Sequence, residues 1–337
     1  MLKKLIVFIV IVAAVCAGAF YYAQHQLNVF LAQPIEVEQQ EMLQVRPGTH
    51  INSVINQAVN ADWIVDSPFS RLVRRLHPEL TDIKVGTYAI DDSMTLLSML
   101  ERVVSGKEHQ YSITFVEGSR FDEWREQLEV ADGLEKVTQS MTEVEIAEHL
   151  GLTREKLEGL FLAETYNYTY GTSDLDILRR ANTALQNNLN DFWASKQEKL
   201  PLKTPYEALI LASIIEKETS VAEERGLVSA VFVNRLNRRM RLQTDPTVIY
   251  GMGDKYQGHI GRKGLDTPTP YNTYVINGLP PTPIAMVGTA SLHAALNPEE
   301  SDYIYFVASG KGGHVFSKTL AEHNRAVRAY LKQIRSK

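Results

Sequence analysis

The chain has 337 residues, of which 44% are hydrophobic and 22% are charged, and its formal net charge is -5 at pH 7. This length allows about two domains with cores of their own, and the composition argues against a long disordered tract. The acidic balance argues against nucleic acid as a partner, because nucleic-acid-binding proteins present basic surfaces.

The N-terminal segment predicts a membrane anchor. Lys3 and Lys4 precede an uncharged apolar run over residues 5–23, close to the ~20 residues that a helix needs to cross a bilayer. No Lys or Arg follows before Arg46, so residues 1–4 are expected in the cytoplasm and the body of the chain on the other side.

Two other targeting signals fit parts of this run. Ala17-Gly18-Ala19 resembles a signal-peptidase site, although the apolar run continues beyond it. Cys16 suggests a lipoprotein, although Val15 is large for the position before such a cysteine. All three interpretations export residues 24–337.

Cysteine and histidine usage narrows the chemistry. Cys16 is the only cysteine and lies in the apolar run, so the exported part has no disulfide and no thiol nucleophile. The nine histidines are scattered without an HExxH motif, so no metal or other cofactor is expected. The SGKGGH stretch at 309–314 lacks Walker spacing and predicts a plain hairpin turn.

After the anchor, a polar stalk is expected over 24–41 and a small α+β module over 42–108. The module should contain a strand ending near Pro47-Gly48, a helix capped by Asn52 or Ser53, and a helix opened by Ser67-Pro68. A strand over 84–90 and a helix from Ser93 complete it. No catalytic constellation is visible in it, so a binding or spacing role is expected.

The remainder, residues 109–337, predicts a larger α+β domain. Its first part should contain a strand over 111–117, a helix over 122–128, a charged helical segment over 131–158 and an aromatic stretch over 159–170. Helices are expected over 174–193, after Pro205, over 223–239, over 289–296 and over 319–334. Loops are expected over 241–253 and 265–282, and a hairpin over 303–317.

The helix that is expected to start after Pro205 carries the most informative carboxylate. At 100° per residue, Glu218 falls on one apolar face with Ala208, Leu211, Ile214 and Ile215, whereas Glu216 falls off that face. Burial raises the pKa of such a group, which suits a general acid. Alternatively, Glu218 reaches solvent at a frayed helix end, or pairs with a buried arginine.

The other candidates for chemistry are also carboxylates. Glu216, Glu218 and Asp245, with Glu164 on the aromatic stretch, are compatible with a two-carboxylate glycosidase. The aromatic stretch favours a sugar cleft or, more commonly, an ordinary aromatic core.

Several motifs closely resemble the YceG-like endolytic murein transglycosylases, and the resemblance covers essentially the whole chain. They are ASIIEKE at 212–218, RLQTDPTVIYGMG at 241–253, YNTY at 271–274, GLPP at 278–281, YFVASGKGGHVFS at 305–317 and EHN at 322–324. Departures from the family pattern occur at Thr282, at 285–288 and at 163–165, all in loops.

The resemblance implies a single-pass protein of the bacterial inner membrane with a periplasmic body and a LysM-like module at 42–108. It implies non-hydrolytic cleavage of peptidoglycan glycan strands, leaving 1,6-anhydro-N-acetylmuramic acid ends, with Glu218 as the catalytic residue. Its motif positions imply substrate contacts; these positions are Gln243, Thr244, Asp245, Tyr271, Asn272 and Tyr274.

Other functions compete with this expectation. One is a muramidase that uses water, and another is a non-catalytic peptidoglycan-binding scaffold. The resemblance to this family, together with anchoring beside the membrane, further implies a link with glycan-polymerising penicillin-binding protein synthases.

Overall fold

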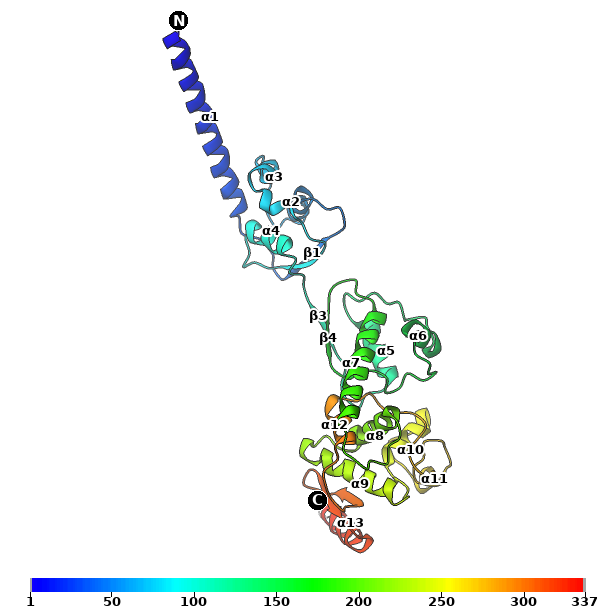
Figure 1. Cartoon of the computed structure of the whole chain (residues 1–337). Helices are drawn as coiled ribbons and strands as arrows, with labels where there is room; N and C mark the ends of the chain where they lie inside the picture. Colours follow the sequence, from blue (N-terminus) through cyan, green and yellow to red (C-terminus); the bar gives the residue numbers. More distant parts are fainter. Residues whose placement is uncertain (1, 336–337) are drawn as a thin grey trace. The chain divides into compact units, whose positions relative to one another are not determined.

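The computed structural model describes residues 2–335 and divides into two units, each of which mixes helices and strands (Figure 1). Unit 1 comprises Met1–Tyr111 and Tyr168–Gly171, and unit 2 comprises Ser112–Asn167 and Thr172–Lys337. The predicted α+β class is confirmed. Met1 of the expected cytoplasmic segment, and Ser336 and Lys337 of the C-terminal domain, lie outside the described residues.

Unit 1 is built on a two-stranded antiparallel sheet, in which Leu43 of β1 lies opposite Tyr88 of β2. Both side chains are buried in one core with the inward faces of the helices. The elements in chain order are α1 (Leu2–Leu31), β1 (Glu41–Val45), α2 (Ile51–Asn60), η1 (Ser70–Leu72), α3 (Val73–Leu76), η2 (Pro78–Thr81), β2 (Gly86–Ile90) and α4 (Leu96–Ser105).

Two local predictions in unit 1 are wrong. The N-cap of α2 is His50, not Asn52 or Ser53, because the helix already begins at Ile51, whose side chain is buried. The helix expected after Ser67-Pro68 is only a 3-10 turn followed by the single turn α3.

Helix α1 differs from the expected arrangement of an anchor followed by a polar stalk over 24–41. The helix continues to Leu31, and Leu27, Phe30 and Leu31 are buried in the core of unit 1, followed by Ile35. Their 3- and 4-residue spacing puts one apolar face of the helix end against the unit. Residues 27–35 therefore belong to the folded unit.

The apolar part of α1 is exposed. The helix Leu2–Leu31 is long and apolar enough to cross a bilayer, and none of its most apolar window is buried. It is compatible with a single-pass membrane anchor.

Unit 2 is organised around α8. This helix packs against α7, α9, α10 and α12, and its residues from Ala208 to Ile215 are buried. The elements are β3 (Tyr111–Thr114), α5 (Phe121–Val130), α6 (Glu143–Leu150), β4 (Thr165–Tyr168), α7 (Asp174–Ala194), α8 (Pro205–Glu218), η3 (Ala222–Glu224), α9 (Arg225–Asn237), α10 (Asp245–Met252), η4 (Gly253–Lys255), α11 (Arg262–Asp266), α12 (Thr289–Leu296), β5 (Tyr305–Ala308), β6 (His314–Ser317) and α13 (Leu320–Arg335).

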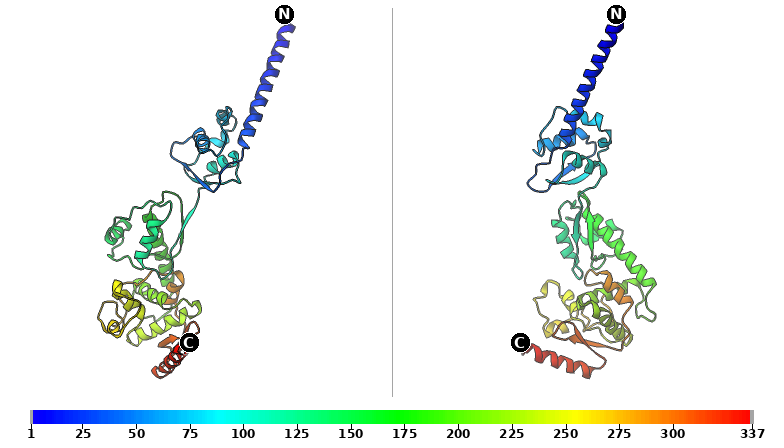
Figure 2. Two further views of the ribbon diagram at one scale, coloured as in Figure 1. Left: turned by 180° about the vertical axis from the view of Figure 1, so that it is seen from behind. Right: turned by 90° about the vertical axis from the view of Figure 1, so that its left-hand side faces the viewer.

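The C-terminal part of unit 2 follows the sequence prediction closely. Strands β5 and β6 form the expected antiparallel hairpin, with Val307 opposite Val315. Helix α13 packs against both strands, as Figure 2 shows at the red end of the chain. The hairpin and α13 together form one wall of the cavity described below.

Two longer predictions in unit 2 are wrong. Within 131–158 only Glu143–Leu150 is helical; Thr142 caps this helix and Gly151, at φ 71°, ends it. The expected loop 241–253 contains the helix α10, because Pro246 stands in its first turn, where a missing N–H costs nothing.

Candidate active site

Local sequence sets both ends of α8. The Thr204 side chain caps its start by accepting a hydrogen bond from the Glu207 backbone N–H at 3.2 Å, and Pro205 follows as the first helical residue. The helix ends at Glu218, because Thr219 is extended at φ -144°. Glu218 is half-buried and stands at the exact point where the chain leaves a buried helix.

The two charged residues before Glu218 hold other parts of unit 2. Glu216 accepts a hydrogen bond from the backbone N–H of Gly288 at 3.0 Å, at the start of α12. Lys217 donates to the carbonyl of Gly118 at 2.9 Å. Only the third charged residue of the EKE sequence, Glu218, lines the cavity described next.

An open cavity of ≈ 540 Å³ lies at the end of α8. Its lining combines polar side chains that could bind a hydroxylated ligand with the apolar wall of the hairpin and α13. The lining residues are Glu218, Arg235, Leu242, Gln243, Asp245, Tyr274, Tyr305, Phe306, Val307, Ala308, His314, Leu320, His323, Asn324 and Val327.

The carboxyl of Glu218 is poised between its two protonation states. Burial raises its pKa to about 7, against a hydrogen bond from the Thr244 hydroxyl to Oε1 that favours the charged form. The negative charge of Asp245 adds to the rise, and His314 and Arg235 oppose it. An acid with this pKa can give up a proton and take it back near neutral pH.

Thr244 is held in place by a small group of hydroxyls. It is the N-cap of α10, but its side chain makes no capping bond and donates to Glu218 instead. The Thr244 backbone N–H donates to Thr273 Oγ1 at 3.1 Å, and the hydroxyls of Thr273 and Thr247 lie 2.8 Å apart. Thr273, in the middle of YNTY, thereby joins the two loop motifs beside Glu218.

Three other predicted residues line the cavity. The Tyr274 hydroxyl donates to Asp245 Oδ1 at 2.6 Å, and burial and then Asp245 raise the pKa of that tyrosine. Gln243 stands beside them at φ 51°, a left-handed conformation that is uncommon outside glycine. Strain of this kind often accompanies functional sites.

The remaining predicted residues lie elsewhere. Asn272 is buried, and its amide donates to the carbonyls of Leu265 and Thr267 at 2.9 and 2.7 Å, so it shapes its own loop. The Tyr271 hydroxyl lies 2.9 Å from that of Thr282. Glu164 lines a different hollow, with Glu117 and Glu216, on another part of unit 2.

Sequence reasoning missed the residues that the hairpin and α9 bring to the cavity. His314 ends the SGKGGH stretch, which by sequence is only a turn. Glu224 accepts from the His314 backbone N–H at 2.8 Å, and its other oxygen lies 2.8 Å from Nδ1. Gly313 takes φ 72°, a left-handed conformation that favours glycine, and a Cβ there would lie 2.3 Å from Glu224 Oε1, so a larger residue would be strained and would displace the Glu224 side chain. The available signal in the sequence was a histidine directly after the glycine pair Gly312-Gly313.

Arg235 was also missed. Its side chain is buried, and it donates to the carbonyls of Ile304 and Leu242, each at 2.7 Å. These bonds fasten the start of the hairpin and the segment before α10 to α9, so Arg235 holds two walls of the cavity together.

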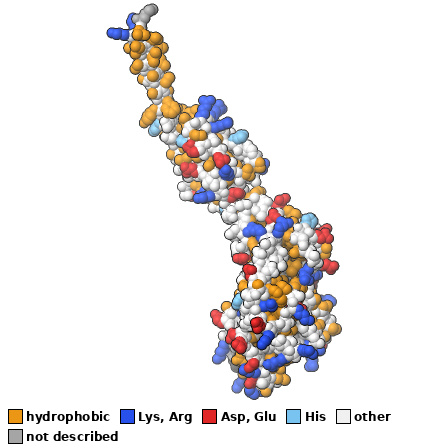
Figure 3. All heavy atoms as spheres, viewed as in Figure 1, with side chains coloured by type: hydrophobic (Ala, Val, Ile, Leu, Met, Phe, Trp, Pro, Cys, Tyr) orange, Lys and Arg blue, Asp and Glu red, His pale blue; other side chains and the backbone are white. Residues whose placement is uncertain are grey.

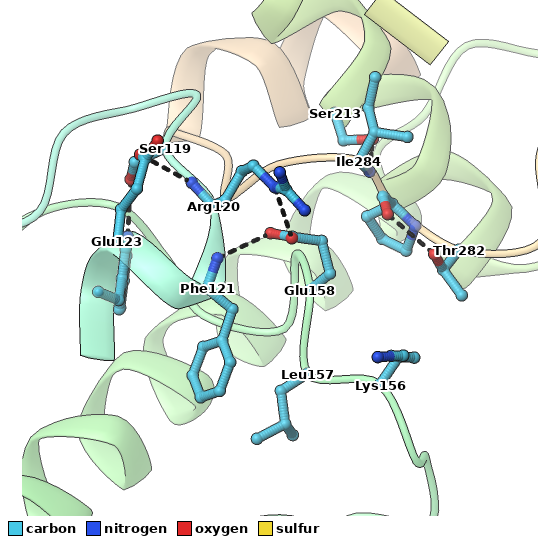
Figure 4. A network of polar contacts seen from close by, with 12 residues as sticks. Ser119, Arg120, Phe121, Glu123, Lys156, Leu157, Glu158, Ser213, Thr282 and Ile284 are labelled. Carbon is cyan, nitrogen blue, oxygen red and sulfur yellow. Dashed lines mark hydrogen bonds and ion pairs between the residues drawn. The ribbon is translucent and has the colours of Figure 1, made fainter. Parts of the chain in front are cut away.

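A second carboxyl with a raised pKa, Glu158, lies outside this cavity. Burial raises its pKa to about 7, and the guanidinium of Arg120 lowers it, with Nε 3.9 Å from Oε2. Glu158 Oε1 accepts the backbone N–H of Phe121 at 3.1 Å, at the start of α5, as Figure 4 shows. The burial of Glu158 is therefore explained by its structural role at the start of α5. A raised pKa alone does not identify Glu218 as the candidate catalytic residue.

Within residues 2–335, no group of three or more His, Cys, Asp or Glu side chains could hold a metal ion. The groups available to a ligand in the cavity are carboxyl, hydroxyl, amide, imidazole and guanidinium groups.

The pKa of Glu218 predicts how stability depends on pH. Below pH 4.5 the Glu218 carboxyl is protonated in both the folded and the unfolded state. Between pH 4.5 and about 7 it loses its proton only in the unfolded state. The contribution of Glu218 to the free energy of unfolding should therefore fall over this window, by up to about 3 kcal/mol.

Denaturant titrations of wild type and Glu218→Gln should check this. The free energy of unfolding of the variant should increase relative to that of wild type as pH rises from 4.5 to 8. Below pH 4.5 the difference between the two proteins should stay constant. A difference that stayed constant over this range would show that the Glu218 pKa is not raised.

Comparisons with known proteins place the chain in context. The model of the YceG-like family matches residues 43–329. An endolytic murein transglycosylase of Bacillus subtilis is 28% identical, over 94% of this chain and 91% of that protein. One of Streptococcus pneumoniae is 25% identical, over 95% of this chain and 64% of that protein. The crystal structure of a yceG-like protein from Listeria monocytogenes has a TM-score of 0.54 and 29% identity, covering 86% of this chain and 99% of that one.

Proposed function

Since this chain belongs to the YceG-like family, we propose that it is an endolytic peptidoglycan lytic transglycosylase that cleaves the MurNAc-GlcNAc β-1,4 bond without water. Relatives that carry the name endolytic murein transglycosylase align over most of its length. The observation that carries the proposal is Glu218, one carboxyl with a pKa of about 7 in an open cavity with hydroxyl, amide and imidazole groups.

In this proposal Glu218 acts first as an acid and then as a base. Its carboxyl protonates the bridging oxygen as the glycosidic bond breaks, and an oxocarbenium-like centre develops at C1 of MurNAc. The C6 hydroxyl of the same sugar attacks C1, and the Glu218 carboxylate takes the hydroxyl proton. A 1,6-anhydro end forms, the acid is regenerated, and each proton transfer contributes on the order of 10²- to 10⁴-fold.

Neighbouring groups would support these steps. Thr244 donates to Glu218 Oε1, which leaves Oε2 to carry the transferred proton. Asp245 could stabilise the positive charge at C1, with its orientation fixed by the Tyr274 hydroxyl.

A muramidase is the second candidate, because Asp245 lines the same cavity as Glu218. In that mechanism a second carboxylate positions or activates water. Digestion of purified sacculi followed by mass spectrometry separates the two, since anhydro ends are lighter than reducing ends by one water. Reducing ends as the main product would reject the transglycosylase proposal.

His314 is proposed to position the glycan. With Nδ1 beside Glu224, Nε2 remains available to hydrogen-bond a sugar hydroxyl, which can donate or accept. His314→Phe should keep the ring but lose this hydrogen bond, lowering kcat/KM by on the order of 10-fold, mainly through KM.

His293→Phe is the matched control, because His293 is exposed on α12 and does not line the cavity. It should retain wild-type kinetics. Equal kinetics of His314→Phe and wild type would refute the positioning role.

The wider setting is proposed on the same basis. The apolar part of α1 would anchor the chain in the bacterial inner membrane, with residues 1–4 cytoplasmic, residues 109–337 forming the periplasmic catalytic domain and residues 42–108 a LysM-like glycan-binding module. The antiparallel pair β1–β2 with helical segments between its strands supports the latter. Partnership with penicillin-binding protein synthases remains a prediction.

A further inference from the structure

Unit 1 carries a basic face beside α1 that the proposed activity does not use. The helix runs without a break from its exposed apolar stretch to Leu27, Phe30 and Leu31, which are buried in the core of unit 1. Five residues separate Tyr22 from Leu27, a rise of about 7.5 Å. If α1 spans the bilayer, as proposed above, this continuous helix keeps unit 1 at the membrane surface.

The far membrane boundary can be located along α1. Eighteen residues separate Lys4 from Tyr22, which corresponds to about 27 Å of helix and matches the ~30 Å of hydrocarbon in a bilayer. With Lys3 and Lys4 at one boundary, Tyr21 and Tyr22 fall at the other, where tyrosine is enriched in membrane proteins.

A segment of unit 1 reaches the same level. The Phe69 ring lies edge-on to that of Tyr22, with ring centroids 6.1 Å apart. Val65, four residues before Phe69, is 74% exposed. An exposed valine and a half-buried phenylalanine at this depth suit the boundary between headgroups and acyl chains.

Three arginines follow Phe69 within six residues. Arg71, Arg74 and Arg75 are exposed, and their side chains make no ion pair or hydrogen bond within residues 2–335. The acidic groups nearby are engaged: Asp66 accepts from the Ser67 backbone N–H at 2.7 Å, and Glu79 pairs with His77 at 2.8 Å. Figure 3 shows Lys and Arg side chains gathered where α1 meets unit 1.

We propose that residues 65–75 form a membrane-docking face, on which Arg71, Arg74 and Arg75 bind the phosphates of anionic lipid headgroups in the leaflet that α1 leaves. Guanidinium groups suit phosphate because they donate two parallel hydrogen bonds as well as charge. The face is continuous with the anchor, and its charge is opposite to that of the lipids. A single helix leaves rotation about its own axis free, whereas this second contact fixes how unit 1 faces the membrane.

The test uses the full chain in nanodiscs of phosphatidylcholine alone or with phosphatidylglycerol added. Cys16→Ala removes the native thiol, and Val65→Cys carries an environment-sensitive fluorophore on the proposed face. Emission should shift to the blue when phosphatidylglycerol is present. Salt at 1 M should reverse the shift, because the Debye length falls to about 3 Å and the attraction between the arginines and the phosphates is screened.

Charge reversal identifies the groups responsible. Arg71→Glu with Arg74→Glu and Arg75→Glu should abolish the shift, lowering the ratio of docked to undocked unit 1 on the order of 100-fold or more. The matched control is Arg46→Glu with Lys84→Glu and Lys107→Glu, exposed positions of the same unit outside this face, which should retain the shift.

The contrary outcomes are distinct. Equal emission in both nanodiscs, or a shift that survives reversal of all three arginines, would overturn the docking face. A shift that needs added glycan fragments rather than phosphatidylglycerol would also overturn it, in favour of glycan binding. Elution of the chain free of nanodiscs would overturn the anchor and the docking face together. Glycan digestion by the same preparations tests the proposed activity separately.

Discussion

Glu218→Gln should reduce the release of anhydro-muropeptides from purified sacculi by on the order of 10³-fold or more. The amide has the shape of the protonated acid and can still accept the Thr244 hydrogen bond. It can neither give a proton to the leaving oxygen nor take one from the C6 hydroxyl, so both proposed steps lose their catalyst. Quantifying anhydro ends by mass spectrometry checks the expectation.

Glu216→Gln is the matched control, two residues away on the same helix. Its side-chain oxygen can still accept from the Gly288 N–H, so α12 should stay in place and most activity should remain. Full activity of Glu218→Gln would show that the acid has been assigned to the wrong residue. Loss of activity in both variants, with intact thermal unfolding, would point to a role for the helix end as a whole.

Arg235→Met should lower the free energy of unfolding of unit 2 by roughly 3 kcal/mol. Methionine follows the aliphatic path of arginine but donates no hydrogen bond. The carbonyls of Ile304 and Leu242 would then be left without their donors in a buried place. Because these bonds join the hairpin and the segment before α10 to α9, activity should fall with stability.

Arg238→Met is the control for this change, since Arg238 is exposed at the end of the same helix. It should alter the free energy of unfolding by less than about 0.5 kcal/mol. Urea denaturation of both variants provides the comparison. Equal stability of Arg235→Met and wild type would mean that the hairpin does not depend on Arg235.

The helix α8 was predicted correctly, because helix formation is encoded at short range. The prediction of a single apolar face was wrong: every residue from Ala208 to Ile215 is buried, because α7, α9, α10 and α12 pack around the helix. Glu216, which was expected to lie off that face, accepts a hydrogen bond from the Gly288 N–H.

The wrong secondary-structure predictions are those in which proline, glycine or charged residues were interpreted by residue type without regard to their position in the helix or turn. Asp245-Pro246 and two glycines suggested a loop, although proline is tolerated in the first turn and α10 packs on α8. The charged stretch over 131–158 suggested a continuous helix, but Gly133 and Gly151 take left-handed conformations and bend the chain on both sides of α6.

The sequence by itself determined the class of fold, the apolar helix and most of the secondary structure around α8. These depend on periodicity and composition, which are local properties. Only the tertiary structure decided that Thr244 and Asp245 lie beside Glu218, that Asn272 supports its own loop, and that Arg235 and the Glu224–His314 pair complete the cavity. Contacts between residues up to 90 positions apart in the chain depend on how the helices pack, and no local pattern records that packing.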